Sequence, residues 1–481
     1  MLFTDPVFLF CFLPLVLLLY YLAPRRARNF VLALASLIFY AAGEWRFLAW
    51  LLASVAVNYV IGRAIAATRG RPAARRWLAL GLASDLALLL AFKYFNFAMA
   101  NVNTLRGWFG APPLQFTALL LPLGISFFTF HKITYKVDVY RGVAEAKRQP
   151  LDLALYILLF PQLIAGPIVR YHEIAAELVR RVYRREDFAA GVRRFVQGFA
   201  RKMIVANPAG YCADRVFALP AAQLTSGLAW LGLLCYTVQI YFDFAGYSDM
   251  AIGLARMFGF HFPENFNYPY ISGSITEFWR RWHMSLSRFF RDYLYIPLGG
   301  NRRGPARTYL NLTLVFFLCG FWHGASWNFA LWGMMHGALL VTERVGLRRA
   351  LERAPRLFRH AYTLLFVSLA WVFFRADTLP HALTYVQALF GLGHTAAAAD
   401  SARYYLNREL LLALTIGVLG SMPLLPWLRR AWERRASAAN SRPVVSFSLG
   451  LAEVAAFVLV LFYSGMLSVV GTYNPFIYFR F

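Results

Sequence analysis

Two histidines in apolar surroundings are the residues of this sequence best suited to chemistry. His323 lies in residues 318–327, inside an apolar stretch at residues 309–340, and His283 lies in the Trp-rich residues 278–285. An imidazole titrates near neutrality, so a buried neutral histidine can take a proton from a hydroxyl that attacks a carbonyl. A second polar group can orient that base or stabilise an oxyanion. The alternative is a structural role, in which each buried histidine only forms hydrogen bonds with backbone carbonyls. The occurrence of two histidines in Trp-rich polar and aromatic segments favours a catalytic role.

Other polar residues have weaker claims to an active site. His336 follows His323 by thirteen residues on the same apolar stretch, and in one helix the two would face different sides, so we assign His336 a structural role. Asp243 and Asp249 could bind an ion or a substrate hydroxyl, or instead cap a helix and pair with arginines. The sequence has no GxSxG, HExxH or P-loop motif. Its four cysteines are scattered without a CxxC pair, so we predict no metal site and no disulfide framework.

The elements that must position these residues are those of a polytopic membrane protein. Of 481 residues, 59% are hydrophobic and 15% are charged, with a mean hydropathy of +0.50, whereas soluble domains carry about 25% charged residues. Many apolar runs approach the roughly 20 residues that a spanning helix needs. The runs are residues 8–22, 30–42, 47–65, 77–95, 114–135, 228–242, 309–340, 361–374, 410–427 and 444–470. We predict an all-α protein with about eleven membrane segments, the first being a retained helix.

The net charge of +26 is concentrated in short loops between these runs. Basic clusters follow the first, third and fifth runs, at residues 25–28, 63–76 and 136–148. By the positive-inside rule these loops are cytoplasmic and the N-terminus is outside. A topology signal, with attraction to anionic lipid, explains the charge better than nucleic-acid binding does.

Residues 153–169 interrupt the alternation of spans. They are apolar but contain Pro161, Gly166 and Pro167, and nine Lys/Arg residues occur among residues 170–202. A re-entrant segment, which enters the membrane and returns, would keep those charges inside. Non-helical backbone at membrane depth is stable only when it is buried in protein or lines a cavity, so we expect this segment to line one.

Several segments resemble the membrane-bound O-acyltransferase family. Residues 278–303 (FWRRWHMSLSRFFRDYLYIPLGGNRR) are similar to its signature, and residues 320–324 (GFWHG) to its invariant-histidine segment. Similarity to the branch of bacterial alginate O-acetyltransferase membrane subunits is found in residues 1–14, 121–130, 160–167, 241–253 and 475–481. The resemblance implies a helical disc pierced by a central tunnel, with both histidines near its narrowest point. We expect one transmembrane domain over residues 1–481, with N-terminal spans at 1–150, a catalytic core at 151–345 and C-terminal spans at 346–481.

The resemblance also implies roles for individual residues. His323 matches the family's invariant catalytic histidine and His283 its second position. Acetyl-CoA would enter from the cytoplasm as donor substrate, with no bound cofactor and no metal. We predict that His323 acts as general base and that His283 positions it or stabilises the oxyanion. Because the planar fork of arginine suits phosphate, residues predicted to bind the substrate or the donor are Arg280, Arg281, Arg291, Asp243 and Trp322.

Partners follow from the same resemblance. It implies a bacterial inner-membrane location, a periplasmic partner of the SGNH type and a polysaccharide acceptor such as alginate. Tyr478, on the predicted outer side, would carry acetyl transiently or anchor the chain as an interfacial aromatic residue. Two alternative functions remain: a transporter or flippase for a lipid-linked saccharide, and a protein acyltransferase with a longer acyl donor. The histidine pair and the lack of detectable inverted repeats favour the acetyltransferase over the transporter.

Overall fold

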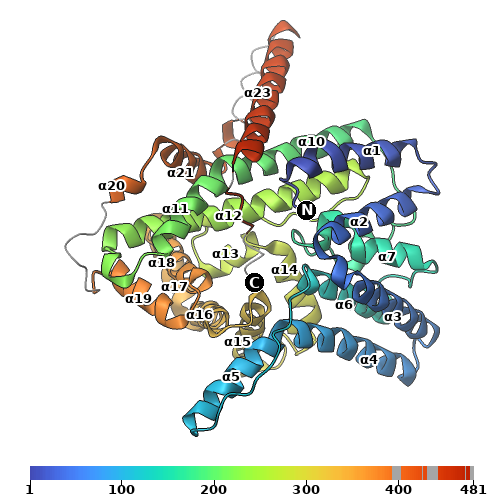
Figure 1. The fold of residues 1–481 in the computed structure, drawn as a ribbon, viewed down its shortest axis with the longest axis horizontal. Coiled ribbons are helices and arrows are strands. Elements are labelled where there is room, and N and C mark those ends of the chain that lie inside the picture. The colour runs from blue at the N-terminus through green and yellow to red at the C-terminus, as the bar shows by residue number, and fades with distance from the viewer. Residues whose placement is uncertain (393–401, 425, 429, 431–442, 472, 477–481) are drawn as a thin grey trace.

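The computed structural model describes residues 1–392, 402–424, 426–428, 430, 443–471 and 473–476 (Figure 1). Its regular elements in these ranges are helices, without a strand, which confirms the all-α prediction. Among the described residues, four helical stretches are long and apolar enough to cross a membrane: Arg28–Ala67, Pro72–Trp108, Ser226–Met257 and Arg356–Arg375. Phe8–Leu22 and Val454–Val470 are shorter apolar helices. The count of about eleven membrane segments therefore stays a prediction.

The N-terminal third forms a layer of helices joined by short loops. Its elements are α1 (Leu13–Leu22), α2 (Arg28–Glu44), α3 (Leu48–Ala67), α4 (Pro72–Leu89), the π-helical η3 (Leu90–Tyr94), α5 (Phe95–Trp108) and α6 (Ile125–Arg141). In Figure 1, α5 extends away from the body of the molecule. The expected span at residues 114–135 is wrong in its first half, because residues 111–122 are not helical. Three prolines in that segment and the left-handed Gly124 (φ 76°) delay the helix to Ile125.

The re-entrant segment has the form that its prolines and glycine predict. It comprises α7 (Pro150–Leu158), a break at Leu159, α8 (Phe160–Leu163) and buried non-helical backbone that leads to α9 (Tyr171–Ile174). Its two ends meet, since Lys147 Nζ donates to the carbonyl of Ala175 at 2.7 Å and Tyr171 Oη donates to the carbonyl of Glu145 at 2.5 Å. The two ends of the segment therefore lie together, and its entry into the membrane and return on one side stay a prediction.

Helix α12 (Ser226–Met257) is the central element of the fold, and 89% of its most apolar window is buried. A long neighbour built from α10 (Arg185–Ala200), η4 (Arg201–Ala206) and α11 (Asn207–Phe217) runs beside it (Figure 1). A Cβ atom at Gly198 would lie 2.4 Å from the carbonyl oxygen of Gly246. Small residues thus let the two backbones approach, as is common between membrane helices.

The predicted apolar stretch at residues 309–340 is two helices rather than one. Helix α15 (Gly304–His323) ends at its histidine, and α16 (Trp327–Thr342) returns along it after a turn. His323 and His336 therefore lie on separate helices, which corrects the single-helix geometry from which their different faces were inferred. A Cβ at Gly333 would lie 2.2 Å from the carbonyl oxygen of Phe316, so the two helices are in direct backbone contact.

The C-terminal part covers the remaining edge of the molecule. It contains η8 (Glu343–Leu347), α17 (Arg348–Arg353), α18 (Arg356–Arg375), α19 (Leu379–Leu389), α20 (Ala402–Tyr405), α21 (Arg408–Gly420) and α23 (Pro443–Val470). Helix α23 projects from the body in Figure 1. After it the chain turns back inward, because Asn474 Nδ2 donates to Thr4 Oγ1 at 2.9 Å and the ring of Phe476 stacks on Tyr247 at 4.7 Å.

The basic loops gather on one face. The Arg28 guanidinium lies 4.5 Å over the ring of Tyr183, and Arg141 donates to the carbonyl of Asp292 at 3.1 Å. These contacts join loops that the positive-inside rule places together in the cytoplasm. Which side of the membrane this face occupies stays a prediction.

Candidate active site

The two predicted histidines come together in the interior. His323 is the last residue of α15, and His283 connects α13 (Ile275–Arg281) to α14 (Met284–Phe290). Their ring centroids are 6.4 Å apart, and the exposed fractions of the residues are 6% for His323 and 0% for His283. Residues forty positions apart in the sequence therefore share one site. Among the described residues no group of three or more His, Cys, Asp or Glu could hold a metal ion.

The backbone of His283 is held in an unusual conformation. Its φ of 42° lies in the left-handed region, where a residue with a side chain costs about 1–2 kcal/mol. The neighbouring Met284 N–H donates to the carbonyl of Asn265 at 2.9 Å, which ties the turn down. Such strain persists only where surrounding contacts determine the conformation, and it occurs often at functional sites.

Asn265 also determines which nitrogen of His283 carries its proton. The Ser285 N–H and Oγ–H both donate to Asn265 Oδ1, at 3.3 Å and 2.8 Å, and Asn265 Nδ2 donates to Ser248 Oγ at 3.0 Å. A backbone N–H can only donate, so this oxygen is the acceptor and the amide orientation is fixed. His283 Nδ1, 3.1 Å from the same oxygen, must therefore be the protonated nitrogen. In the neutral ring Nε2 is left with its lone pair, and it has no hydrogen-bond partner among the described residues.

The re-entrant segment reaches this network directly. The Ile168 N–H donates to Ser285 Oγ at 2.9 Å, and Ile164 lines the cavity described below. The expectation that this segment lines a cavity is confirmed.

Aromatic rings enclose His323. Trp322 lies 4.8 Å from its ring and Trp332 and Phe374 lie 5.2 Å away, all in edge-on geometry. On its other face Trp322 stacks on Phe130 at 5.0 Å. This packing restricts water around the histidine and fixes its ring plane.

A lysine that sequence reasoning missed lies beside His323. Lys93 Nζ, on η3, donates to the carbonyl of Trp322 at 2.5 Å, the carbonyl of His323 at 3.3 Å and Ser126 Oγ at 3.2 Å. Its residue is only 8% exposed. The sequence did contain a signal for Lys93, because burying a charged lysine at membrane depth costs free energy and such residues are usually functional. Asn265 carried a weaker signal, because it lies in the polar and aromatic segment between α12 and α13.

His323 opens onto a cavity of about 390 Å³. Lys93, Trp322 and His323 form part of its wall, together with the loop at residues 121–127, and Glu44 and Met1 also line it. A second cavity of about 260 Å³ shares Lys93 and Leu121 with the first and continues toward Arg375. The site is therefore accessible from the face that carries the N-terminus and the end of α2.

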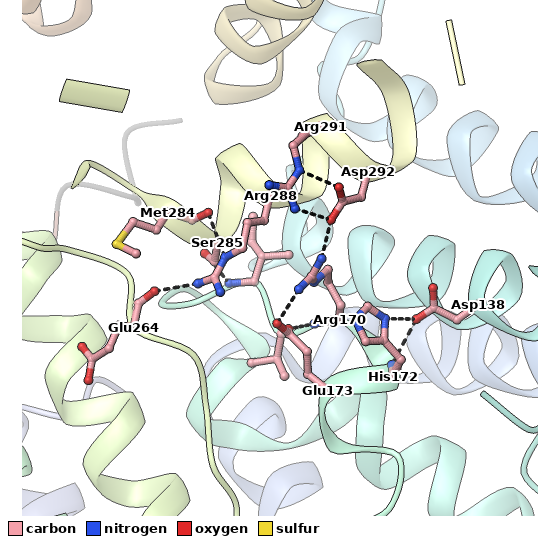
Figure 2. A network of polar contacts seen from close by, with 12 residues as sticks. Asp138, Arg170, His172, Glu173, Glu264, Met284, Ser285, Arg288, Arg291 and Asp292 are labelled. Carbon is pink, nitrogen blue, oxygen red and sulfur yellow. Dashed lines mark hydrogen bonds and ion pairs between the residues drawn. The ribbon is translucent and has the colours of Figure 1, made fainter. Parts of the chain in front are cut away.

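A separate polar network lies among the basic loops (Figure 2). Arg170 pairs with Glu173 at 2.7 Å and with Asp292 at 2.5 Å, and Arg291 pairs with Asp292 at 2.7 Å. Burial raises the pKa of the Asp292 carboxyl, but the hydrogen bond from Arg291 and the charges of the surrounding arginines outweigh it and hold that pKa below its ordinary value. Arg288 differs, because it donates to the backbone carbonyls of Met284 (3.3 Å) and Glu264 (2.9 Å).

The predicted binding residues fall in different places. Trp322 is at the histidine site. Arg291 is in the network of Figure 2, and Arg281 pairs with Glu277 at 2.9 Å. Arg280 is exposed, at the end of α13. Asp243 is buried in α12, 2.9 Å from Lys202 Nζ, and Tyr478 lies outside the described residues.

Comparisons with known proteins agree with this architecture. The model of the membrane-bound O-acyltransferase family matches residues 88–376, which include both histidines. The chain is 47% identical over 420 residues to the probable alginate O-acetylase AlgI of Azotobacter vinelandii, covering 87% of this chain and 83% of that one. It is 44% identical to the probable alginate O-acetylase AlgI of Pseudomonas putida over the full length of both chains. Identity to the peptidoglycan O-acetyltransferase of Helicobacter pylori is 38%, covering 85% of this chain and 84% of that one.

Proposed function

The chain belongs to the membrane-bound O-acyltransferase family and is a membrane O-acetyltransferase, and from this premise we propose the route of its acetyl group. Acetyl-CoA binds at the cytoplasmic face, and its acetyl group passes through the protein to a hydroxyl acceptor on the far side. A periplasmic partner of the SGNH type completes O-acetylation of a polysaccharide. The relatives are named for alginate and for peptidoglycan, and alginate is the acceptor favoured by their identities.

The juxtaposition of His283 and His323 carries this proposal. The rings are 6.4 Å apart, the residues are buried, and a cavity that is also lined by Met1 and Glu44 reaches His323. A small acyl group and an attacking hydroxyl would meet between them. The phosphate-bearing donor would bind near Arg280, Arg281 and Arg291, because the planar guanidinium group of arginine suits phosphate.

The reaction divides between the two histidines. His323 takes the proton of the acceptor hydroxyl while its oxygen attacks the thioester carbonyl. The tetrahedral intermediate then collapses, the C–S bond breaks, and the proton passes to the departing thiolate. Because Asn265 leaves a lone pair on Nε2 of neutral His283, that histidine accepts a hydrogen bond in the site and orients the reacting groups.

The test is acetyl transfer from labelled acetyl-CoA by membrane-embedded protein. We expect His323→Ala to lower transfer by about 10²–10⁴-fold at matched expression, because a general base contributes about that much. His336→Gln is the matched control, since His336 is equally buried and glutamine keeps an acceptor for Trp279 Nε1–H, which donates to His336 Nδ1 at 3.2 Å. Equal turnover by His323→Ala and wild type would show that His323 is structural. Transfer by neither, with partner present, would contradict the proposal.

Donor length separates this function from that of a longer-chain acyltransferase. We compare acetyl-CoA with palmitoyl-CoA as donors in the same membranes. The proposal requires acetyl to be the preferred group, and a preference for palmitoyl would favour the protein acyltransferase alternative.

A further inference from the structure

The tetrahedral intermediate needs a hydrogen-bond donor that neutral His283 does not supply. When the hydroxyl adds to the thioester carbonyl, the carbonyl electrons move to oxygen and form an oxyanion. Preorganised donors aimed at such an oxygen are usually the largest single contribution to acyl-transfer catalysis. His283 donates its Nδ1 proton to Asn265 Oδ1, so its Nε2 accepts rather than donates. His323, as the base, begins with a free lone pair as well.

Trp322 provides a suitable donor. Its residue is 5% exposed, its ring lies 4.8 Å from that of His323, and it lines the same cavity. Its Nε1–H is buried and has no hydrogen-bond partner among the described residues. An unpaired buried N–H has lost its hydrogen bonds to water without replacing them, so a substrate oxygen that accepts from it would restore a hydrogen bond. An indole nitrogen donates only, which suits a developing negative charge.

Lys93 holds this donor and the base in one arrangement. Its ammonium donates to the carbonyls of both Trp322 and His323, which are consecutive residues at the end of α15. A third bond, to Ser126 Oγ at 3.2 Å, fixes the ammonium from the loop side of the cavity. The three donors of Lys93 are thus occupied by the protein, so it acts through its neighbours and adds positive charge nearby.

We propose that Trp322 Nε1–H stabilises the oxyanion of the tetrahedral intermediate and that Lys93 is the positioning residue that aligns Trp322 with His323. The C–O bond forms while the hydroxyl proton moves to His323. The oxyanion accepts the indole N–H bond, and collapse expels the thiolate, which takes the proton back as a thiol. This assignment rests on the proposed acyl transfer at His323.

Trp322→Phe tests the donor, because it removes the N–H and retains an aromatic ring. We expect kcat for acetyl transfer to fall by about 10²-fold, the usual effect of losing one oxyanion donor, while the KM for acetyl-CoA stays unchanged. Trp371→Phe is the matched control. Trp371 is also fully buried and carries a buried Nε1–H, but it packs behind Trp332, at 5.9 Å, and is not among the residues that line the two cavities. We expect it to retain the wild-type kcat.

The outcomes distinguish this inference from the proposed function. If wild type transfers acetyl and Trp322→Phe keeps full kcat, the oxyanion assignment is wrong while the function stands. If both tryptophan variants lose activity equally, the effect is packing and the assignment is again wrong. If wild type transfers nothing, the proposed function itself fails.

Lys93 supplies a second, independent variant pair should Trp322→Phe fold poorly. We expect Lys93→Met to lower kcat without raising the KM for acetyl-CoA, and Lys93→Arg, which keeps donors for the two carbonyls, to recover part of the loss. A Lys93→Met enzyme with wild-type kcat would overturn the positioning role.

Discussion

At the scale of single residues, the hydrogen bonds around His283 and His323 distinguish the roles of the two histidines, which the distance between their rings does not. The histidine pair was predictable from sequence, because both residues lie in distinctive Trp-rich segments. Their division of labour was not predictable, because it depends on Asn265, eighteen residues from His283 and without a motif of its own. The position of Lys93 beside His323 was not predictable either. Its partners are backbone carbonyls about 230 residues away in the sequence, and any residue type can provide a carbonyl.

Asn265→Ala tests whether Asn265 holds the proton of His283 on Nδ1. Without the amide oxygen, His283 loses the acceptor that holds its Nδ1 proton, and the left-handed turn loses its side-chain support. We expect acetyl transfer to fall on the order of 10²-fold, within the range attributed to positioned acid–base groups. Steady-state transfer from labelled acetyl-CoA measures this. Ser248→Ala is the control, because it removes only the partner of Asn265 Nδ2, and a loss as large as that of Asn265→Ala would contradict the tautomer explanation.

At the scale of elements, hydropathy located most helices but not their ends. The runs predicted at residues 30–42 and 47–65 correspond to α2 and α3, and the re-entrant segment was predicted from its prolines, glycine and charges. The run at residues 309–340 concealed a hairpin, because an apolar composition does not reveal a turn. Residues 114–122 are apolar without being helical. The signals that would have corrected both are local, namely the Gly-Ala-Ser turn after His323 and the prolines before α6.

The contact between α15 and α16 gives a prediction for Gly333→Ala. The added Cβ would lie 2.2 Å from the carbonyl oxygen of Phe316, which is backbone and cannot rotate away. Helix α16 must move, and Trp332, the neighbour of Gly333, contacts His323. We expect a lower unfolding temperature in detergent and reduced acetyl transfer. Gly107→Ala is the control: no heavy atom lies within 4 Å of its new Cβ, and alanine is favoured over glycine in a helix by about 1 kcal/mol. Equal stability of the two variants would contradict the packing explanation.

At the scale of the whole molecule, the protein has two separate polar regions. The network of Arg170, Arg291 and Asp292 lies among the basic loops (Figure 2). The cavity of Lys93 and His323 opens beside Met1 and Glu44. His323 lines the open cavity and is not part of the cationic network. This arrangement suits a donor and an acceptor that approach from opposite sides of a membrane.

The side assignment can be tested by cysteine labelling in spheroplasts. Cys11 is exposed and is replaced by serine, and the other three cysteines are buried: Cys212, Cys235 and Cys319. A cysteine introduced at the surface is then the thiol that the reagent can reach. We expect Gly107→Cys, at the end of α5, to react with a membrane-impermeant maleimide in intact spheroplasts. Arg75→Cys, an exposed position in the first turn of α4 within the basic cluster at residues 63–76, should react only after lysis, because basic clusters stay in the cytoplasm.

The reverse labelling pattern would exchange the sides from which the donor and the acceptor enter. Met1 and Glu44 line the cavity of His323, so the side that holds the N-terminus is the side from which that cavity is entered. With the N-terminus outside, the cavity admits the acceptor, and Lys93 and Trp322 lie on the acceptor's path. With the N-terminus inside, the same cavity would be the entrance for acetyl-CoA, and the arginines of Figure 2 would face away from the donor. Labelling of Arg75→Cys before lysis would therefore reverse the assignment of both substrates while leaving the histidine pair in place.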